Sequence, residues 1–425
     1  MQVQVHDRAF STGRFIPEGT EFRKFLPVTM FHIMLYSSMA NPSPHHRHQA
    51  SLKGVIDFST EPPLGANERV EARRRFYHIV NHFEDTEKRN SSGSSGNEPY
   101  NRPVFVRLTY EYALSEESQD HYLRAFFRFM ALSVTGEDVD FGDKNLKDEI
   151  RSTLLSFADY LLDSFFLPLR ASTKKTPQPS PAHRSAVERG AQQFFGTPER
   201  VSALHGTCLV RDRHRCVISR RFDQKEAVKR WEKDGKNYKD DDGNSLVSEG
   251  FNKLEVAHIL PRSLTKIESG SELSASKQAA LAILNMFDSG IGHLIEGANI
   301  DQPHNALTLT ADLHELFGDF RIYFTSTEQE HSYRIDSFLP PALLPIHLPV
   351  TRTLYLTPNR TIDPPLPRLL AIHRAIAHIL HLSAAGQYID RILRDVEETG
   401  VRADGSTDLS RILRLGLGGW LRVAI

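Results

Sequence analysis

Two histidines and one asparagine stand beside short apolar segments, and their types and order could support proton transfer and metal binding. His258 follows one apolar run, Asn305 opens a second, and His314 comes nine positions after Asn305. Histidine is the side chain whose ordinary pKa suits proton transfer near neutral pH, and it is also a common metal ligand. A histidine base beside a divalent cation could hydrolyse a phosphodiester, because the base activates water and the cation neutralises charge on the phosphoryl and leaving oxygens.

The sequence around these residues predicts two strands and a helix that would hold them in place. Apolar residues alternate with others over residues 254–258, which is the period of a half-buried strand, and Pro261 then ends it. Residues 306–309 form a short apolar run suited to a second strand. Asp312 is expected to cap a short helix, from which His314 projects away from the apolar side.

This order of residues resembles the HNH motif of the ββα-metal endonucleases, and in particular the HNH proteins common in fungal genomes. The resemblance covers about residues 185–400 and includes the flanking segments 215–219 and 318–320. It implies an α+β fold with a ββα-metal (HNH) module as its centre. An insertion separates the two strands of that module, which is flanked by a helical N-terminal region and a C-terminal helix.

The resemblance implies metal-dependent hydrolysis of phosphodiester bonds in nucleic acid. His258 would be the general base, Asn305 would orient the loop that carries it, and His314 would hold the metal. Asp319 is the first candidate for a further metal ligand. Glu255 is the second, because strand alternation places it on the face opposite His258. Since base and metal must act on one phosphorus atom, His258 and His314 are expected to converge on one cleft.

The implied cofactor is a divalent metal ion. Mg²⁺ is the first expectation, because this hard ion keeps several waters and needs few protein ligands, and Mn²⁺ and Zn²⁺ are the alternatives. The implied partner is nucleic acid, DNA in the first place, and no membrane partner is expected.

Five arginines fall within eleven positions just before the motif. A guanidinium group offers a fork of donors to phosphate, so these residues could grip a nucleic-acid backbone, with a solvated turn surface as the alternative. The expected patch consists of Arg211, Arg213, Arg215, Arg220 and Arg221. The lysine-rich run after it, residues 225–239, is interpreted as an exposed helix and loop, because acidic residues dilute it.

Two positions differ from the family's pattern and leave other functions open. Many HNH enzymes have Asp or His directly before the catalytic His, where this chain has Ala257. Related sequences often have an acid or His four residues after the last His, where this chain has Gly318. The chain could therefore be a degenerate HNH module that binds nucleic acid or a protein partner without cutting. A third reading is a regulatory protein whose N-terminal region does the work.

The composition sets limits on these readings. A chain of 425 residues with 40% hydrophobic and 25% charged residues is typical of a globular protein with two or three domains. Its net charge of −1 means that nucleic acid must be attracted by a local basic patch. The two cysteines fit a reducing compartment and predict an intracellular protein, in the nucleus or the cytoplasm.

Ser/Gly-rich and Pro-rich segments divide the chain into five expected regions. These are a poorly defined N-terminal segment with a Ser/Gly-rich linker (1–102), a mixed, mainly helical region (103–170), a Pro-rich linker (171–184), the HNH nuclease-like domain (185–340), and a Pro-rich connection with a C-terminal helical region (341–425). Alternating apolar residues predict a strand over 104–112. Apolar spacing further predicts helices over 122–130, 150–165, 275–287 and 369–396, and a hairpin over 320–335.

Overall fold

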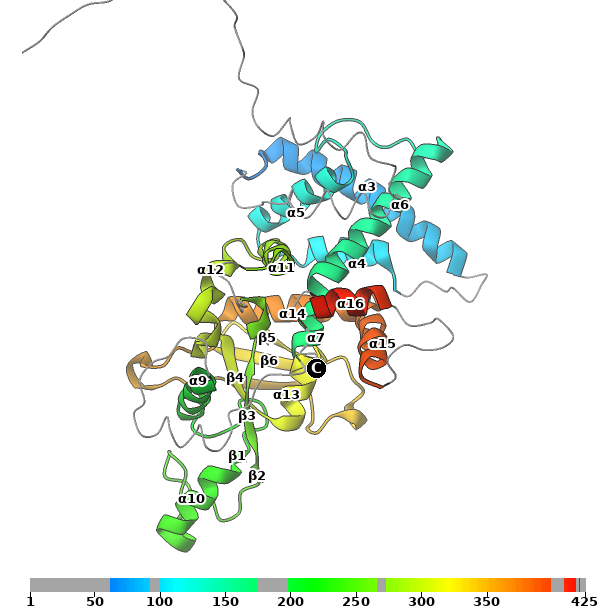
Figure 1. The fold of residues 1–425 in the computed structure, drawn as a ribbon. Coiled ribbons are helices and arrows are strands. Elements are labelled where there is room, and N and C mark those ends of the chain that lie inside the picture. Colours follow the sequence, from blue (N-terminus) through cyan, green and yellow to red (C-terminus); the bar gives the residue numbers. More distant parts are fainter. Residues whose placement is uncertain are drawn as a thin grey trace, which may run out of the picture. The chain divides into compact units, whose positions relative to one another are not determined.

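The computed structural model shows a chain of many helices and three small sheets (Figure 1). The residues that it describes are 62–91, 100–173, 198–265, 273–398, 409–417 and 420. All of them belong to one compact unit, His48–Ile425. The expectation of a mixed helix-and-sheet protein is confirmed.

The bounds of the elements follow the order of the chain. The helices are α3 (Ala66–Ser91), α4 (Arg102–Glu111), α5 (Glu116–Phe129), α6 (Lys144–Leu161), α7 (Leu167–Thr173), α9 (Pro198–Arg211), α10 (Gln224–Asp234), α11 (Ala275–Asn285), α12 (Ile291–Ile295), α13 (Ala311–Gly318), α14 (Pro367–Leu382), α15 (Ala385–Glu398) and α16 (Leu409–Leu417). The strands are β1 (Phe222–Asp223), β2 (Phe251–Asn252), β3 (Leu254–His258), β4 (Ala306–Thr310), β5 (Ile322–Ser326), β6 (Ser332–Ser337) and β7 (Val350–Thr353).

The predicted strand over 104–112 is wrong, because these residues form helix α4. Asn101 caps this helix by accepting a hydrogen bond from the backbone amide of Val104, and Pro103 occupies its first turn. Helix α4 packs against α3, α5, α6 and α14, so apolar side chains are buried nearly all round it. A helix that is apolar on every side loses its periodicity, and the residual alternation of this one imitates a strand.

Strands β3 and β4 form the antiparallel pair expected from the motif, and α13 follows β4 directly. The register pairs Leu254 with Thr310 and His258 with Ala306. Helices α11 and α12 lie in the long insertion between the two strands. Thr310 is the residue at the N-cap of α13, and the predicted cap, Asp312, lies inside its first turn.

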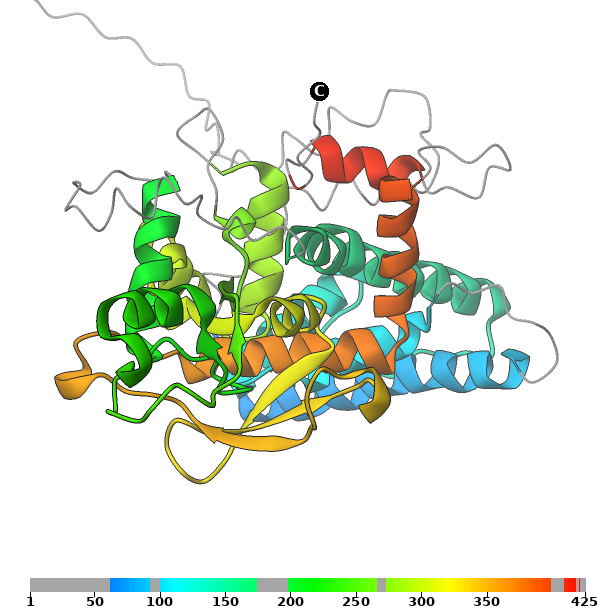
Figure 2. The same cartoon turned by 90° about the horizontal axis from the view of Figure 1, so that it is seen from below.

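The predicted hairpin is present as β5 and β6, and β7 adds a third strand that the sequence did not indicate. Helix α14 packs on β5, and Figure 2 shows α14 running along these strands. The predicted C-terminal helix is divided into α14 and α15, which are bent by 87° relative to each other. Among the described helices, none alone has the length and apolar content to cross a membrane, and only the bent pair of α14 with Ala385–Asp395 reaches these by length and composition.

The hydrophobic core is continuous between the N-terminal helices and the motif. Phe76 of α3, Phe157 of α6, Leu309 of β4 and Ile376 of α14 belong to the same buried cluster. Residues 174–184 of the predicted linker lie outside the described part, and the five regions stay a prediction.

Arg170 of α7 is the buried charge that joins the N-terminal helices to the motif. Its side chain is only 2% exposed and binds Asp319, just after α13, and Asp390 of α15. Arg321, in turn, donates to Asp390 at 2.7 Å. Two carboxylates from distant segments therefore neutralise one buried guanidinium, as burial of a charge requires.

We expect Arg170→Met to lower the free energy of unfolding by about 2–3 kcal/mol, because it leaves two partly buried carboxylates without their main partner. Urea denaturation measures the change. Arg394→Met on the exposed side of α15 removes the same group where it makes no ion pair among the described residues, and it should change stability by less than about 0.5 kcal/mol. Equal effects of the two substitutions would show that Arg170 does not connect the segments.

Candidate functional site

Asn305 is fully buried and uses its side-chain amide to tie two loops together. Its Nδ2 donates to the carbonyl oxygens of Leu260 at 3.0 Å and Ile300 at 2.9 Å. Its Oδ1 accepts from the backbone amide of Leu260 at 2.9 Å. The segment that follows His258 is thus held against the 3-10 turn Gly297–Asp301.

These three hydrogen bonds of Asn305, called the Asn305 clamp below, also place His258 beside a carboxylate. The Nε2 of His258 lies 3.2 Å from Oδ1 of Asp301, and both side chains are almost completely buried. Arg200 and Arg262 each approach Asp301 to 3.4 Å. Burial alone would raise the pKa of Asp301, but the hydrogen bond from His258 and the charge of Arg262 bring it below its ordinary value. An ionised Asp301 favours the tautomer with the proton on Nε2, so Nδ1 is the nitrogen that can accept a proton.

Sequence reasoning missed Asp301, Arg200 and Arg262. Asp301 and Arg262 each lie four residues from a motif residue, before Asn305 and after His258 respectively. That proximity was the only available signal, because the insertion that brings Asp301 back to His258 has no sequence pattern that fixes its path.

His314 of α13 lies beside a different carboxylate, which strand β3 supplies. Its Nδ1 is 3.0 Å from Oε2 of Glu255 in β3, and Lys253 donates to the other oxygen of Glu255 at 2.7 Å. The hydrogen bond with His314 and the charge of Lys253 lower the pKa of Glu255 to about 2, although partial burial acts in the opposite direction. The expected order of ligands is therefore corrected. Glu255 is the carboxylate that reaches His314, whereas Asp319 is bound by Arg170.

The two histidines lie on opposite faces of the β3–β4 pair, in contrast to the expected single cleft. His258 shares a face with Val256 and Ala306, which pack against Leu204 and Cys208 of α9. Glu255 is on the other face, which α13 covers and where His314 meets it. Each face therefore holds one imidazole–carboxylate pair, and a substrate would have to reach both around the end of the strands.

The described residues do not form a complete metal site. No group of three or more His, Cys, Asp or Glu side chains that could hold an ion is found among them. His314 and Glu255 supply two possible donors, and these already bind each other. Mg²⁺ can be bound by few protein ligands, but the described residues of this site lack a convergent donor set.

Only part of the expected arginine patch is exposed to solvent. Arg211 is buried, is paired with Asp212, and donates to the carbonyl oxygens of Pro303 and Ala306. Burial alone would lower the pKa of Arg211, but the charge of Asp212 keeps it above its ordinary value. Arg211 is thus a structural cation that fixes α9 to β4, and it is withdrawn from the nucleic-acid patch.

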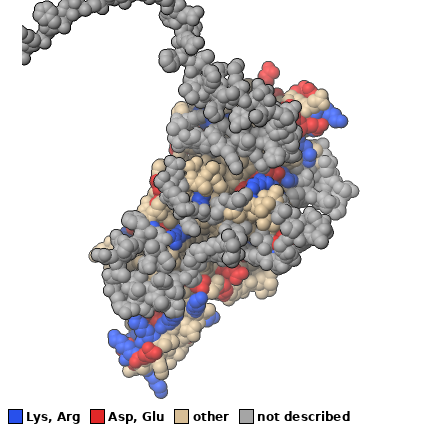
Figure 3. Space-filling view, viewed as in Figure 1, with Lys and Arg blue, Asp and Glu red and all other residues tan. Residues whose placement is uncertain are grey.

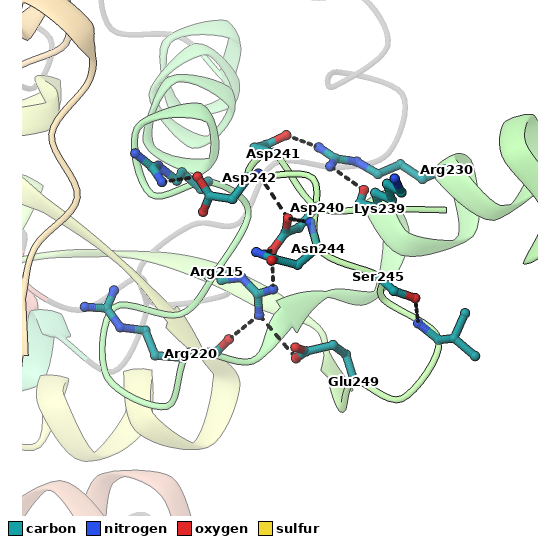
Figure 4. Close-up of polar contacts among 12 residues, drawn as sticks. Arg215, Arg220, Arg230, Lys239, Asp240, Asp241, Asp242, Asn244, Ser245 and Glu249 are labelled. Atoms are coloured by element: carbon teal, nitrogen blue, oxygen red, sulfur yellow. Dashed lines mark hydrogen bonds and ion pairs between the residues drawn. The ribbon is translucent and has the colours of Figure 1, made fainter. Parts of the chain in front are cut away.

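Arg215 is withdrawn as well, because acidic side chains enclose it. It binds Asp240 at 2.8 Å and Glu249 at 3.3 Å, and Figure 4 shows its guanidinium pointing between the two. Arg213 pairs with Asp242, and Arg220 lies 4.4 Å from the ring centroid of Tyr355.

Arg221 is exposed. The remaining patch, Arg213, Arg220 and Arg221, is therefore smaller and less positive than the sequence suggested.

Replacing Glu255 by Gln tests the His314–Glu255 pair through pH. The pKa of Glu255 lies near 2 in the folded chain and near 4.5 when unfolded, so its ionised form contributes stability that is complete above pH 4.5 and disappears as the pH falls toward 2. Wild type should exceed Glu255→Gln by roughly 1–2 kcal/mol at pH 7, since the pair is partly exposed, and this difference should shrink from pH 5 to pH 3.

Urea denaturation at several pH values measures this difference, with Glu328→Gln, at an exposed position, as the control. A difference that stays constant or grows on acidification contradicts the pairing.

A family model described as HNH endonuclease matches residues 216–325, which include β3, β4 and α13. Comparisons with curated proteins and with solved structures gave no match. The narrower similarity to fungal proteins stays an expectation. The segment that carries His258, Asn305 and His314 is thus similar to the HNH endonucleases, a family of nucleic-acid hydrolases that generally use divalent metal ions.

Proposed function

We propose that this chain is an endonuclease that hydrolyses phosphodiester bonds of nucleic acid, DNA in the first place. The observation that carries the proposal is the Asn305 clamp, which fixes His258 and Asp301 in contact within the segment similar to HNH endonucleases. A base held by a carboxylate and by braced loops is what general-base catalysis requires.

Each residue of this site has a distinct task in the proposed reaction. Nδ1 of His258 takes a proton from the attacking water, and Asp301 keeps the imidazole oriented and stabilises the imidazolium that forms. Arg200 and Arg262 add positive charge beside the base, where negative charge gathers on the phosphoryl oxygens. His314 and Glu255 are the two donors that a divalent ion would meet, with Mg²⁺ ahead of Mn²⁺ and Zn²⁺. An intracellular location stays a prediction.

A second candidate is an HNH module that binds nucleic acid without cutting it. The side chain of His258 is only 3% exposed, and His314 lies on the other face of the strands. Ala257, at the position where many relatives carry a metal ligand, is buried and apolar. These observations favour a folded module that has kept its clamp and lost its metal shell.

A plasmid-nicking assay separates the two candidates. Wild type is incubated with supercoiled plasmid in Mg²⁺, Mn²⁺, Zn²⁺ or EDTA, and we expect nicking with a divalent ion and none with EDTA. His258→Ala should reduce the nicking rate by about 10²–10⁴-fold, because it removes the base. His293→Ala, which changes an exposed histidine of α12, should nick like wild type.

If His258→Ala nicks as fast as wild type, the assignment of His258 as base is wrong. If wild type binds the plasmid and never nicks it with any of the three ions, the second candidate is correct.

A further inference from the structure

Helix α10 carries large apolar side chains that the described structure leaves about half exposed. Trp231 is 55% exposed and Val228 is 50% exposed, one helical turn apart on the same side of the helix. Ala227, one turn before Trp231, is buried against β1 and β2, so Trp231 lies at the edge of the buried side of the helix. A half-exposed indole on a helix that already has a buried side indicates a surface that contacts a ligand or a partner.

Lysines occupy a different part of the exposed surface of this helix. Lys225, Lys229 and Lys233 lie four positions apart in one exposed row on α10, on the side away from Trp231, and Lys236 and Lys239 follow the helix. Among the described residues, Lys229 has only a 3.9 Å approach to Glu226, and the other four have no ion pair. Figure 3 shows blue side chains gathered at the end of the molecule that α10 forms.

The acidic residues that seemed to dilute these lysines are held by arginines instead. Asp240 binds Arg215 and Asp241 binds Arg230 (Figure 4). Asp242 binds Arg213. Glu226 is likewise occupied by Arg230 at 2.9 Å. Only Glu232 and Asp234 remain on α10 to oppose five lysines. The run interpreted from the sequence as a diluted, solvated helix is thus a positively charged surface.

Helix α10 is also fixed to the strand that carries the candidate site. One oxygen of Asp223 caps α10 by accepting from the backbone amide of Glu226, and the other accepts from the backbone amide of Leu254, the first residue of β3. Strands β1 and β2 pair in parallel beside this contact. A ligand held on α10 is therefore positioned relative to His258 and Glu255.

We propose that α10 binds a single-stranded stretch of nucleic acid that crosses the helix, with phosphates on the lysine row and a base stacked on Trp231 at the other edge of the exposed surface. A duplex offers no open base face to an indole, whereas unpaired bases stack on aromatic side chains and their phosphates follow basic grooves. This inference rests on the proposed function in so far as both require nucleic acid as the partner. It adds the site of contact and the strandedness of the substrate.

Binding of a fluorescent 20-nucleotide single strand, measured by anisotropy in EDTA over a range of salt, tests the proposal without requiring cleavage. Lys225→Gln/Lys233→Gln should weaken binding at low salt and reduce the slope of log K against log salt by about 1.4, since each lost phosphate contact contributes about 0.7. Lys144→Gln/Lys147→Gln removes the same charge from α6, and it should keep the wild-type slope.

Trp231→Ala should weaken single-strand binding by about 5- to 150-fold, the loss of one stacked base. In a Trp420→Phe background, Trp231 is the sole tryptophan, and its fluorescence should be quenched by the oligonucleotide. The same duplex sequence should bind more weakly than the single strand and respond little to Trp231→Ala.

Wild-type affinity in both α10 variants overturns the proposal, and this is also the result expected if the surface binds a protein. Tighter binding of the duplex, unchanged by Trp231→Ala, overturns it as well. Either result can occur while wild type still nicks plasmid and His258→Ala does not, so failure of this inference is distinguishable from failure of the nuclease assignment.

Discussion

The candidate site depends on one buried amide, that of Asn305. Its three hydrogen bonds reach Leu260, two residues after His258, and Ile300, the residue before Asp301. An aspartate there would lack the two donors and bring a charge into a fully buried position, and an alanine would leave backbone groups unsatisfied. The insertion between β3 and β4 is long, and these hydrogen bonds hold its last turn beside the end of β3.

The β3–β4 pair divides the chemistry between two faces. On the α9 side, His258 and Asp301 are closed off from solvent, with Arg200 and Arg262 at the edge. On the α13 side, Glu255 meets His314. A strand rises only about 3.3 Å per residue, so the two pairs are roughly 10 Å apart along β3 as well as on opposite faces. Cleavage therefore requires that both pairs become accessible to one substrate at the end of the strands. Binding without cleavage does not require this access. Burial, more than the identity of the residues, separates the two candidate functions.

The sequence could predict what neighbouring residues determine, and little that depends on distant partners. The strand predicted over 254–258 and the helix carrying His314 are present as β3 and α13. Both were predictable because the period of a strand or a helix can be recognised in a few neighbouring residues. Arg215 was expected at a surface, because its partners Asp240 and Glu249 come 25 and 34 residues later. The strand predicted at α4 was wrong for a related reason, because tertiary packing buries most of the surface of this helix. The sequence favours Asp319 over Glu255 as the carboxylate beside His314. In the structure Arg170 binds Asp319, and Glu255 lies against His314.

The distribution of charge connects these corrections. A chain with a net charge of −1 attracts nucleic acid only where its cations and anions are separated. Arginines supply that separation, because each guanidinium pairs with carboxylates that would otherwise oppose the lysines. Arg213, Arg215 and Arg230 do this for three consecutive aspartates, Asp240 to Asp242. These arginines are thus less available to phosphate, while fewer acidic side chains remain to oppose the lysines of α10. The sequence predicts the positive surface at residues 211–221, whereas the ion pairs of the folded chain leave it on the exposed part of helix α10.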